Sequence, residues 1–230
     1  MTIISHSKKF IFIKARKVAS SSVLVALGQH CENLDIVTAP GNTEGYPRNK
    51  MNSEGIETHS HPSIIQSLIT PEQWQNYTKI TCVRNPWDMA VSLLLWQFHM
   101  RGARKPGTRK QMHVYSPSFE KMIRSQNIDT TDPEYRECFS RVYSVLSKNC
   151  YFYFDEAGSP QADIFLRFEN LQSEYDELCD RLNLPRTLLP LLKSRFRKKE
   201  WIYQNFYDEE LIDNVYRASS PIVDYFNYKF

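Results

Sequence analysis

The chain has 230 residues, of which 41% are hydrophobic and 13% aromatic, and its formal net charge at pH 7 is +3. A chain of this size and composition buries a substantial core, which predicts one domain over residues 1–230. The slight positive charge does not by itself indicate nucleic-acid binding. The longest apolar run, residues 91–96, is too short to cross a bilayer.

The first predicted strand, residues 10–13, leads toward Lys17 and three consecutive serines, Ser20, Ser21 and Ser22. A helix that begins at these serines leaves backbone N–H groups unpaired and carries the positive end of the helix dipole, while the lysine adds a full charge. This pattern predicts a site for a phosphate or sulfate group. Taken alone, the segment fits a serine-capped helix with a solvated lysine equally well.

The segment lacks the glycines of the phosphate loop found in nucleoside triphosphatases. No glycine lies between Lys14 and Leu27, and Lys17 precedes the hydroxyl residues instead of standing beside them, as G-x-x-x-x-G-K-[ST] requires. An ATP-dependent, magnesium-requiring kinase is therefore the weaker alternative.

Two histidines, His59 and His61, follow a stretch rich in glycine, proline and asparagine at residues 38–57 that we expect to line an acceptor site. Because the pKa of histidine is near neutrality, either ring suits the removal of a proton from an acceptor hydroxyl. A metal site is not expected here, since no third and fourth ligand accompany the pair. Two short helices are predicted next, over residues 62–69 and 71–77.

A second buried strand, residues 80–83, ends at Arg84, and a well-specified helix follows it. Asn85 suits the N-cap and Pro86 the first helical position. Ser92 lies seven residues past the cap, which is close to two turns, or about 10 Å along the same helix face. We expect Arg84 and Ser92 to hold one phosphate between them.

The remaining chain predicts a breaker-rich mobile loop over residues 101–108 and a third buried strand over residues 163–168. Two apolar stripes at helical spacing are interpreted as core faces. They are Tyr135, Phe139, Val142 and Leu146, and Leu171, Tyr175, Leu178 and Leu182.

Together the segments resemble the sulfotransferases that use 3′-phosphoadenosine 5′-phosphosulfate (PAPS). In that family K-x-[GA]-[ST]-[ST] grips the 5′-phosphosulfate and R-N-x-x-D-x-x-V-S grips the 3′-phosphate, and residues 17–21 and 84–92 match these patterns. The sequences R-N-P-W-D at 84–88 and R-F-E-N-L at 167–171 are similar to the carbohydrate and bacterial branch, which includes Golgi-type 2-O-sulfotransferases. The resemblance covers nearly the whole chain.

The resemblance implies a single-domain α/β fold, with a parallel sheet flanked by helices and a P-loop-like phosphosulfate-binding loop. The implied donor is PAPS, and no metal is needed. Phe168 is implied to touch the adenine, with a plain core position as the alternative. The implied donor-binding residues are Lys17, Val18, Ala19, Ser20, Ser21, Ser22, Arg84, Ser92 and Phe168.

For catalysis, the resemblance implies a direct in-line displacement without a covalent enzyme intermediate. His59 is the predicted general base, and His61 remains a rival because the 2-O-sulfotransferases carry an H-x-H pair at this place. Lys17 is implied to steady the charge that grows on the leaving phosphate. One or two residues of a late basic segment are implied to reach the 3′-phosphate, the candidates being Arg195, Arg197, Lys198 and Lys199.

Two features depart from the family pattern: Arg16 stands where many relatives carry proline, and no tryptophan follows the serines. The acceptor stays open between a saccharide and a small natural product with a hydroxyl or amine, and the compact chain without an apolar anchor favours the small molecule. Five widely spaced cysteines indicate reduced thiols. The N-terminus has no apolar run typical of a signal peptide, and no run is long enough for a membrane anchor such as the Golgi members carry, which predicts a cytoplasmic protein. A non-catalytic nucleotide-binding module is the other alternative, and the oligomeric state is unknown.

Overall fold

The computed structural model describes residues 2–38, 59–101, 115–192 and 201–230. The chain divides into two compact units, one formed by Met1–Arg84 with Asn149–Leu192 and the other by Asn85–Lys148 with Lys193–Phe230. That residues 1–230 form a single domain stays a prediction. The predicted loops over residues 38–57 and 101–108 lie outside the described residues except for their first residues, Thr38 and Arg101.

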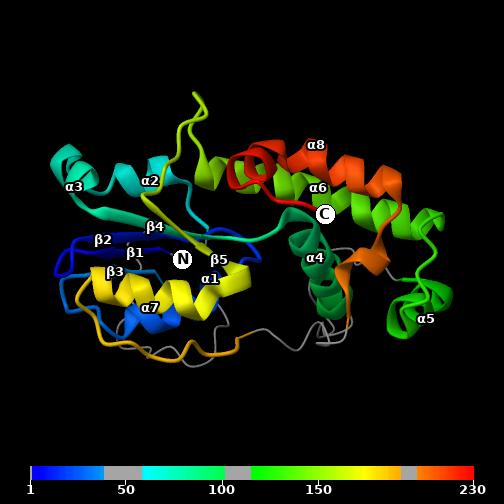
Figure 1. Ribbon diagram of the computed structural model, residues 1–230, viewed down its shortest axis with the longest axis horizontal. Coiled ribbons are helices and arrows are strands. Elements are labelled where there is room, and N and C mark those ends of the chain that lie inside the picture. The colour runs from blue at the N-terminus through cyan, green and yellow to red at the C-terminus, as the bar shows by residue number, and fades with distance from the viewer. Residues whose placement is uncertain (1, 39–58, 102–114, 193–200) are drawn as a thin grey trace, which may run out of the picture. The chain divides into compact units, whose positions relative to one another are not determined.

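The first unit is built on a five-stranded mixed sheet in the order β3-β1-β2-β4-β5 (Figure 1). The strands are β1 (Ile3–Ser5), β2 (Phe10–Ile13), β3 (Ile36–Val37), β4 (Thr78–Val83) and β5 (Ile164–Arg167). The three predicted strands, β2, β4 and β5, pair in parallel. The sheet is not wholly parallel, however, because β1 runs antiparallel to both β2 and β3. These two additional strands are three and two residues long, too short to show a sequence period.

Helices flank this sheet, which confirms the α/β class. In Figure 1, α1 (Ser20–Gly28) and α7 (Leu171–Arg181) lie below the strands, and α2 (Pro62–Gln66) and α3 (Pro71–Asn76) lie above them. A short 3-10 helix, η2 (Phe168–Asn170), joins β5 to α7. All four residues of β2 are buried, as expected for a strand that is covered on both faces.

The second unit consists of helices. It contains α4 (Pro86–Arg101), α5 (Pro117–Ser125), most of α6 (Pro133–Tyr153), the 3-10 helix η4 (Tyr203–Phe206) and α8 (Glu209–Phe226). The predicted stripe on α6 is buried at all four positions. On α7 in the first unit, Tyr175 and Leu178 are buried, whereas Leu171 and Leu182 are half-buried.

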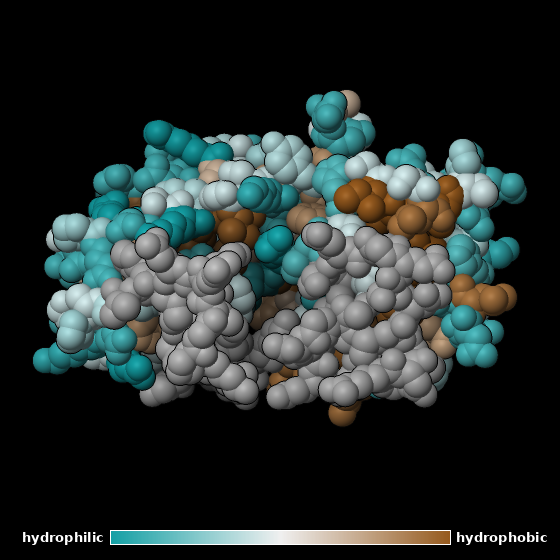
Figure 2. All heavy atoms as spheres, turned by 180° about the vertical axis from the view of Figure 1, so that it is seen from behind, coloured by the Kyte–Doolittle hydropathy of each residue, from teal (hydrophilic) through white to brown (hydrophobic). Residues whose placement is uncertain are grey.

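All five cysteines are free thiols. Cys82 is fully buried in β4, and its burial raises the pKa of the thiol far above the ordinary value, which confirms a core position. In the part of the chain that the structure describes, no helix has the length and apolar character needed to span a membrane. Around the residues drawn in grey, the coloured surface in Figure 2 shows many hydrophilic side chains, with hydrophobic ones in separate patches.

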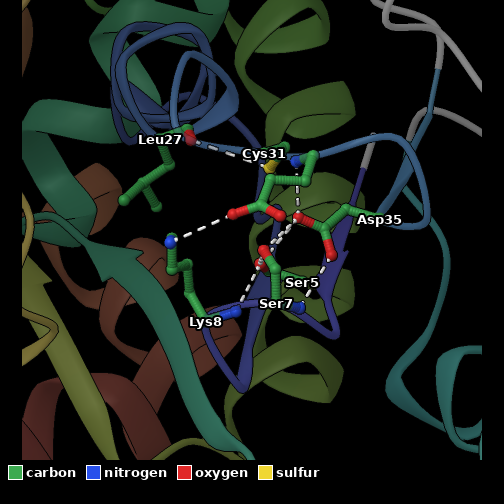
Figure 3. A network of polar contacts seen from close by, with 7 residues as sticks. Ser5, Ser7, Lys8, Leu27, Cys31 and Asp35 are labelled. Atoms are coloured by element: carbon green, nitrogen blue, oxygen red, sulfur yellow. Dashed lines mark hydrogen bonds and ion pairs between the residues drawn. The ribbon is translucent and has the colours of Figure 1, made fainter.

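A buried carboxylate joins the β1–β2 hairpin to the turn that precedes β3 (Figure 3). Asp35 is 2% exposed and accepts hydrogen bonds from Ser5 Oγ at 3.0 Å, from the Ser7 N–H and hydroxyl at 3.0 and 2.7 Å, and from the Glu32 N–H at 2.8 Å. Burial alone would raise the pKa of Asp35, but these hydrogen bonds to the charged form lower it below its usual value.

Replacing this carboxylate should therefore destabilise the protein in a pH-dependent way. We expect Asp35→Asn to lower the free energy of unfolding at pH 7 by about 1–3 kcal/mol, because an amide nitrogen meets groups that donate hydrogen bonds. The folded pKa is depressed, so the contribution of Asp35 is full above the unfolded pKa of about 3.9 and is lost as the pH falls through the folded pKa. The difference between variant and wild type should shrink at pH 3 in urea denaturation.

Asp180, an exposed carboxylate paired with Arg186, provides the control. Asp180→Asn should change the stability much less than Asp35→Asn at pH 7. Equal losses in the two variants would contradict a special role for the buried carboxylate.

Candidate functional site

The loop between β2 and α1 has a backbone that residues other than glycine rarely adopt. The φ angles of Lys17 and Ala19 are +61° and +57°, both in the left-handed region, which costs about 1–2 kcal/mol for each residue with a Cβ. Ala19 is the N-cap of α1 and makes no side-chain capping hydrogen bond, and no acidic residue occupies the first turn. Left-handed residues before a helix N-terminus direct backbone N–H groups into a concavity of the kind that binds anions.

Side chains from distant parts of the first unit hold this loop in place. Each of the four consecutive backbone carbonyls at residues 14–17, here called the carbonyl row, accepts a hydrogen bond from a different side chain. The pairs are His59 Nδ1 to Lys14 O at 3.0 Å, Ser20 Oγ to Ala15 O at 2.7 Å, Asn149 Nδ2 to Arg16 O at 2.9 Å and Arg84 Nη1 to Lys17 O at 3.2 Å. Three predicted site residues, His59, Ser20 and Arg84, are thus brought to one short segment.

Arg84 is 8% exposed and lies over an aromatic ring as well as beside the loop. Its guanidinium carbon is 3.9 Å from the centroid of the Phe168 ring. Phe168 itself is half-buried, so it is not a plain core residue; it forms a platform that fixes the plane of the guanidinium. A contact between Phe168 and adenine stays a prediction.

His59 is half-buried, and its ring lies edge-on to Phe152 with 6.4 Å between the centroids. Because a carbonyl oxygen only accepts hydrogen bonds, the contact with Lys14 O requires the proton on Nδ1, and Nε2 keeps its lone pair. Burial lowers the pKa of His59 to about 3, and the positive charges of Lys14 and Arg16 contribute to the decrease. The ring is therefore neutral at physiological pH, with Nε2 as the proton-accepting atom.

His61 has the opposite arrangement, because it is the N-cap of α2. Its Nδ1 accepts a hydrogen bond from the backbone N–H of Ser63 at 3.3 Å and lies 2.8 Å from the Ser63 hydroxyl. In the neutral ring the proton is then on Nε2, which makes that nitrogen a donor. The two histidines predicted as rivals thus differ in tautomer.

The serines and Val18 contribute to the loop in different ways from those expected. Ser20, Ser21 and Ser22 are 3%, 8% and 5% exposed. The Ser20 hydroxyl donates its proton to Ala15 O, so this hydroxyl serves the shape of the loop. Val18 has its side chain fully buried in the core, which leaves only its backbone for ligand contact.

The start of α4, in the second unit, confirms the predicted cap. Asn85 Oδ1 accepts hydrogen bonds from the N–H groups of Trp87 and Asp88 at 3.0 and 3.4 Å, and Asn85 Nδ2 donates to Lys229 O at 2.8 Å. Trp87 Nε1 donates to Ile212 O at 3.0 Å. This segment therefore holds the C-terminal tail and α8 as well as beginning a helix.

Ser92 is half-buried on α4 and belongs to the second unit, whereas Arg84 closes the first. Their joint grip on one phosphate stays a prediction. The four basic candidates of the late segment, Arg195, Arg197, Lys198 and Lys199, lie outside the described residues. Among the residues that are described, His, Cys, Asp and Glu side chains form no group of three that could hold a metal ion.

Two features of the site were not predicted from the sequence. Asn149 on α6 is fully buried and makes two hydrogen bonds with the backbone N–H and C=O of Arg16, and Phe168 supports Arg84. An asparagine inside a helical pattern gives no such signal. The sequence did hold a signal for the second feature. Arg84 directly follows β4 and Phe168 directly follows β5, and neighbouring parallel strands bring their carboxyl ends together.

Comparison with known proteins identifies a family. A family model described as the sulfotransferase family matches residues 1–226. Searches against curated proteins and against solved structures gave no match.

The strained backbone of the loop predicts the sign of a stability change. Ala19→Gly should raise the free energy of unfolding by about 0.5–1 kcal/mol, because glycine adopts φ +57° without a Cβ clash. This net gain is what is left after glycine raises the conformational entropy of the unfolded chain, which favours unfolding. The matched control is Ala26→Gly in α1, where helical geometry makes the same substitution unfavourable by about 1 kcal/mol or more. Chemical denaturation measures both changes, and a loss in Ala19→Gly would contradict the strain.

Proposed function

Because the chain belongs to the sulfotransferase family and therefore serves sulfuryl transfer, we propose that it moves the sulfuryl group of PAPS to a hydroxyl or amine of a small-molecule natural product or a saccharide. The observation that carries the proposal is the carbonyl row. These four carbonyls bring the nearly buried Arg84 and the neutral His59 to the left-handed loop that precedes α1.

The chemistry of these groups fits a donor with several anionic groups. The loop at Lys17–Ala19 offers backbone N–H groups and one ammonium to a phosphosulfate, and Arg84 offers a planar guanidinium suited to a phosphate. In this proposal Ser92 shares the 3′-phosphate with Arg84. The backbone of Val18 and Ala19 and the backbone and hydroxyl groups of the serines face the 5′ end.

The proposed reaction is an in-line displacement. The acceptor oxygen forms a bond to sulfur while the bond between sulfur and the bridging phosphate oxygen breaks, and the acceptor proton passes to His59 Nε2. Lys17 stabilises the negative charge that develops on the departing phosphate. Most of the rate enhancement then comes from orientation and from charges fixed before the reaction.

The low pKa of His59 fits this role when the charge of the donor is considered. A base with a pKa of about 3 is fully unprotonated, but it draws a proton only weakly. Burial is the main cause of the low pKa, and the charges of Lys14 and Arg16 add to it. In this proposal an anionic donor bound beside these two residues offsets the part of the decrease that comes from their charge.

In this proposal His61 is a less suitable base than His59, because its Nδ1 caps α2 and its Nε2 carries the proton. We propose that it orients the acceptor or only closes the helix. The acceptor itself is proposed to be a small molecule in preference to a saccharide. A cytoplasmic setting is part of the proposal, and the five free cysteines support it.

Nucleotide binding tests the donor assignment directly. The protein should bind 3′-phosphoadenosine 5′-phosphate (PAP) without metal and at least about tenfold more tightly than AMP, because charged hydrogen bonds to the extra phosphate contribute about 1.5–3 kcal/mol. Arg84→Lys should reduce this preference, since lysine keeps the charge but lacks the planar fork. Isothermal titration calorimetry measures both effects.

The control for this experiment is Arg186→Ala, which removes an exposed arginine paired with Asp180 and should leave the preference unchanged. Equal affinity of the wild type for PAP and AMP would overturn the assignment of Arg84 and Ser92. A requirement for magnesium would favour a kinase instead.

Variants of the basic residues separate their roles in turnover. His59→Ala should lower kcat by about 10²–10⁴-fold and leave PAP affinity nearly unchanged, because a general base acts on the acceptor proton. Lys17→Ala should reduce both kcat and PAP affinity, since its proposed partner is the donor. His61→Ala should have the mildest effect. Product formation at saturating donor and PAP calorimetry provide the comparison.

The histidine assignment has two ways to fail. An inactive His61→Ala variant beside an active His59→Ala variant would transfer the base to His61. Activity in both would show that another group accepts the proton.

A further inference from the structure

We propose that Asn149 is a positioning residue for the anion-binding loop, acting through the backbone N–H and C=O of Arg16 rather than on any ligand. The role in turnover rests on the proposed function, whereas the effect on the loop does not. Asn149 lies on α6, 133 residues from Arg16 along the chain, and belongs to the first unit.

The contact joins both backbone polar groups of Arg16, its N–H and its C=O, to one side chain. The Arg16 N–H donates to Asn149 Oδ1 at 3.2 Å, and Asn149 Nδ2 donates to Arg16 O at 2.9 Å. A primary amide is the side-chain group that has a donor and an acceptor at the spacing of a backbone strand. Asn149 is fully buried, so little water competes for these hydrogen bonds.

The loop needs such a restraint because its own sequence does not favour its shape. Lys17, directly after Arg16, and Ala19 both have positive φ angles without being glycine. Strained residues of this kind persist only when the surrounding structure determines their conformation. Of the four side chains that bind the carbonyl row, His59, Ser20 and Arg84 already belong to the proposed site, and Asn149 is the additional one.

The carbonyl row also links the loop to the base. Arg16 is two residues from Lys14, whose carbonyl accepts a hydrogen bond from His59 Nδ1–H. It is also adjacent to Lys17, whose carbonyl accepts a hydrogen bond from Arg84 Nη1. Loss of the Asn149 amide therefore releases the segment between the base and the arginine. Both donor affinity and turnover should decrease, although Asn149 touches neither ligand.

Asn149→Asp is the sharpest test, because aspartate has nearly the same shape and still accepts from the Arg16 N–H but repels the Arg16 carbonyl. Tyr153→Phe is the matched control: Tyr153 lies one turn further along α6, is 1% exposed, and donates to Cys82 O at 2.9 Å in β4. Both changes remove one buried hydrogen bond from α6 to the backbone of the sheet region, but only the first reaches the loop.

Two measurements are made on wild type and both variants. Asn149→Asp should weaken PAP binding about tenfold in calorimetry, which corresponds to 1.4 kcal/mol, and Tyr153→Phe should weaken it less than twofold. Amide hydrogen exchange at residues 14–19 should accelerate at least tenfold in Asn149→Asp relative to Tyr153→Phe, compared at equal global stability. If Asn149→Asp does not fold, Asn149→Ser replaces it in both measurements, with the same expectations.

Unchanged exchange at the loop would overturn the positioning role, whether or not PAP binds. Accelerated exchange with unchanged PAP affinity would also overturn it, because the loop would then not hold the donor. If the wild type fails to bind PAP, the donor assignment falls, and the exchange measurement still decides whether Asn149 holds the loop.

Discussion

The candidate site depends on the hydrogen bonds that the four consecutive backbone carbonyls at residues 14–17 accept from side chains. In an ordinary strand-to-helix connection, the carbonyls after the strand bind water or neighbouring backbone, and glycine provides the sharp turn. Here each carbonyl at residues 14–17 binds a side chain, and the turn is made by lysine and alanine with positive φ angles. Side chains from four places in the sequence thus supply the restraint that local sequence does not. The concave backbone at the start of α1 is consequently a property of the tertiary structure.

The same geometry distinguishes two histidines that are nearly adjacent in the chain. The rings of His59 and His61 are chemically identical, but the partner of Nδ1 is a carbonyl in one case and a backbone N–H in the other. The position of the proton, and with it the nitrogen that is able to accept another, follows from this difference. Burial beside positive residues keeps the His59 ring neutral. In the proposed reaction, the strength of His59 as a base would therefore depend in part on the charge of what binds next to it.

The sequence predicted the elements with strong local signals. The strands β2, β4 and β5 were visible as apolar runs, the cap of α4 followed from Asn85 and Pro86, and the α6 stripe followed from its helical period. The antiparallel strands β1 and β3 were missed because two or three residues have no measurable period. The motifs predicted His59, Lys17 and Arg84 as site candidates. Neither the tautomers nor the contact of Asn149 with Arg16 was predictable, because both depend on residues that meet only after folding.

The span of these contacts along the chain also sets an order in time. The segment at residues 14–17 leaves the ribosome before three of its partners, which lie 45, 67 and 133 residues downstream. At about 5–20 residues per second, the last of them is synthesised roughly 7–27 s after the loop itself. Until then the left-handed turn lacks the two hydrogen bonds between Asn149 and the backbone of Arg16. If the loop binds the donor as proposed, that binding has to wait until residue 149 has been made.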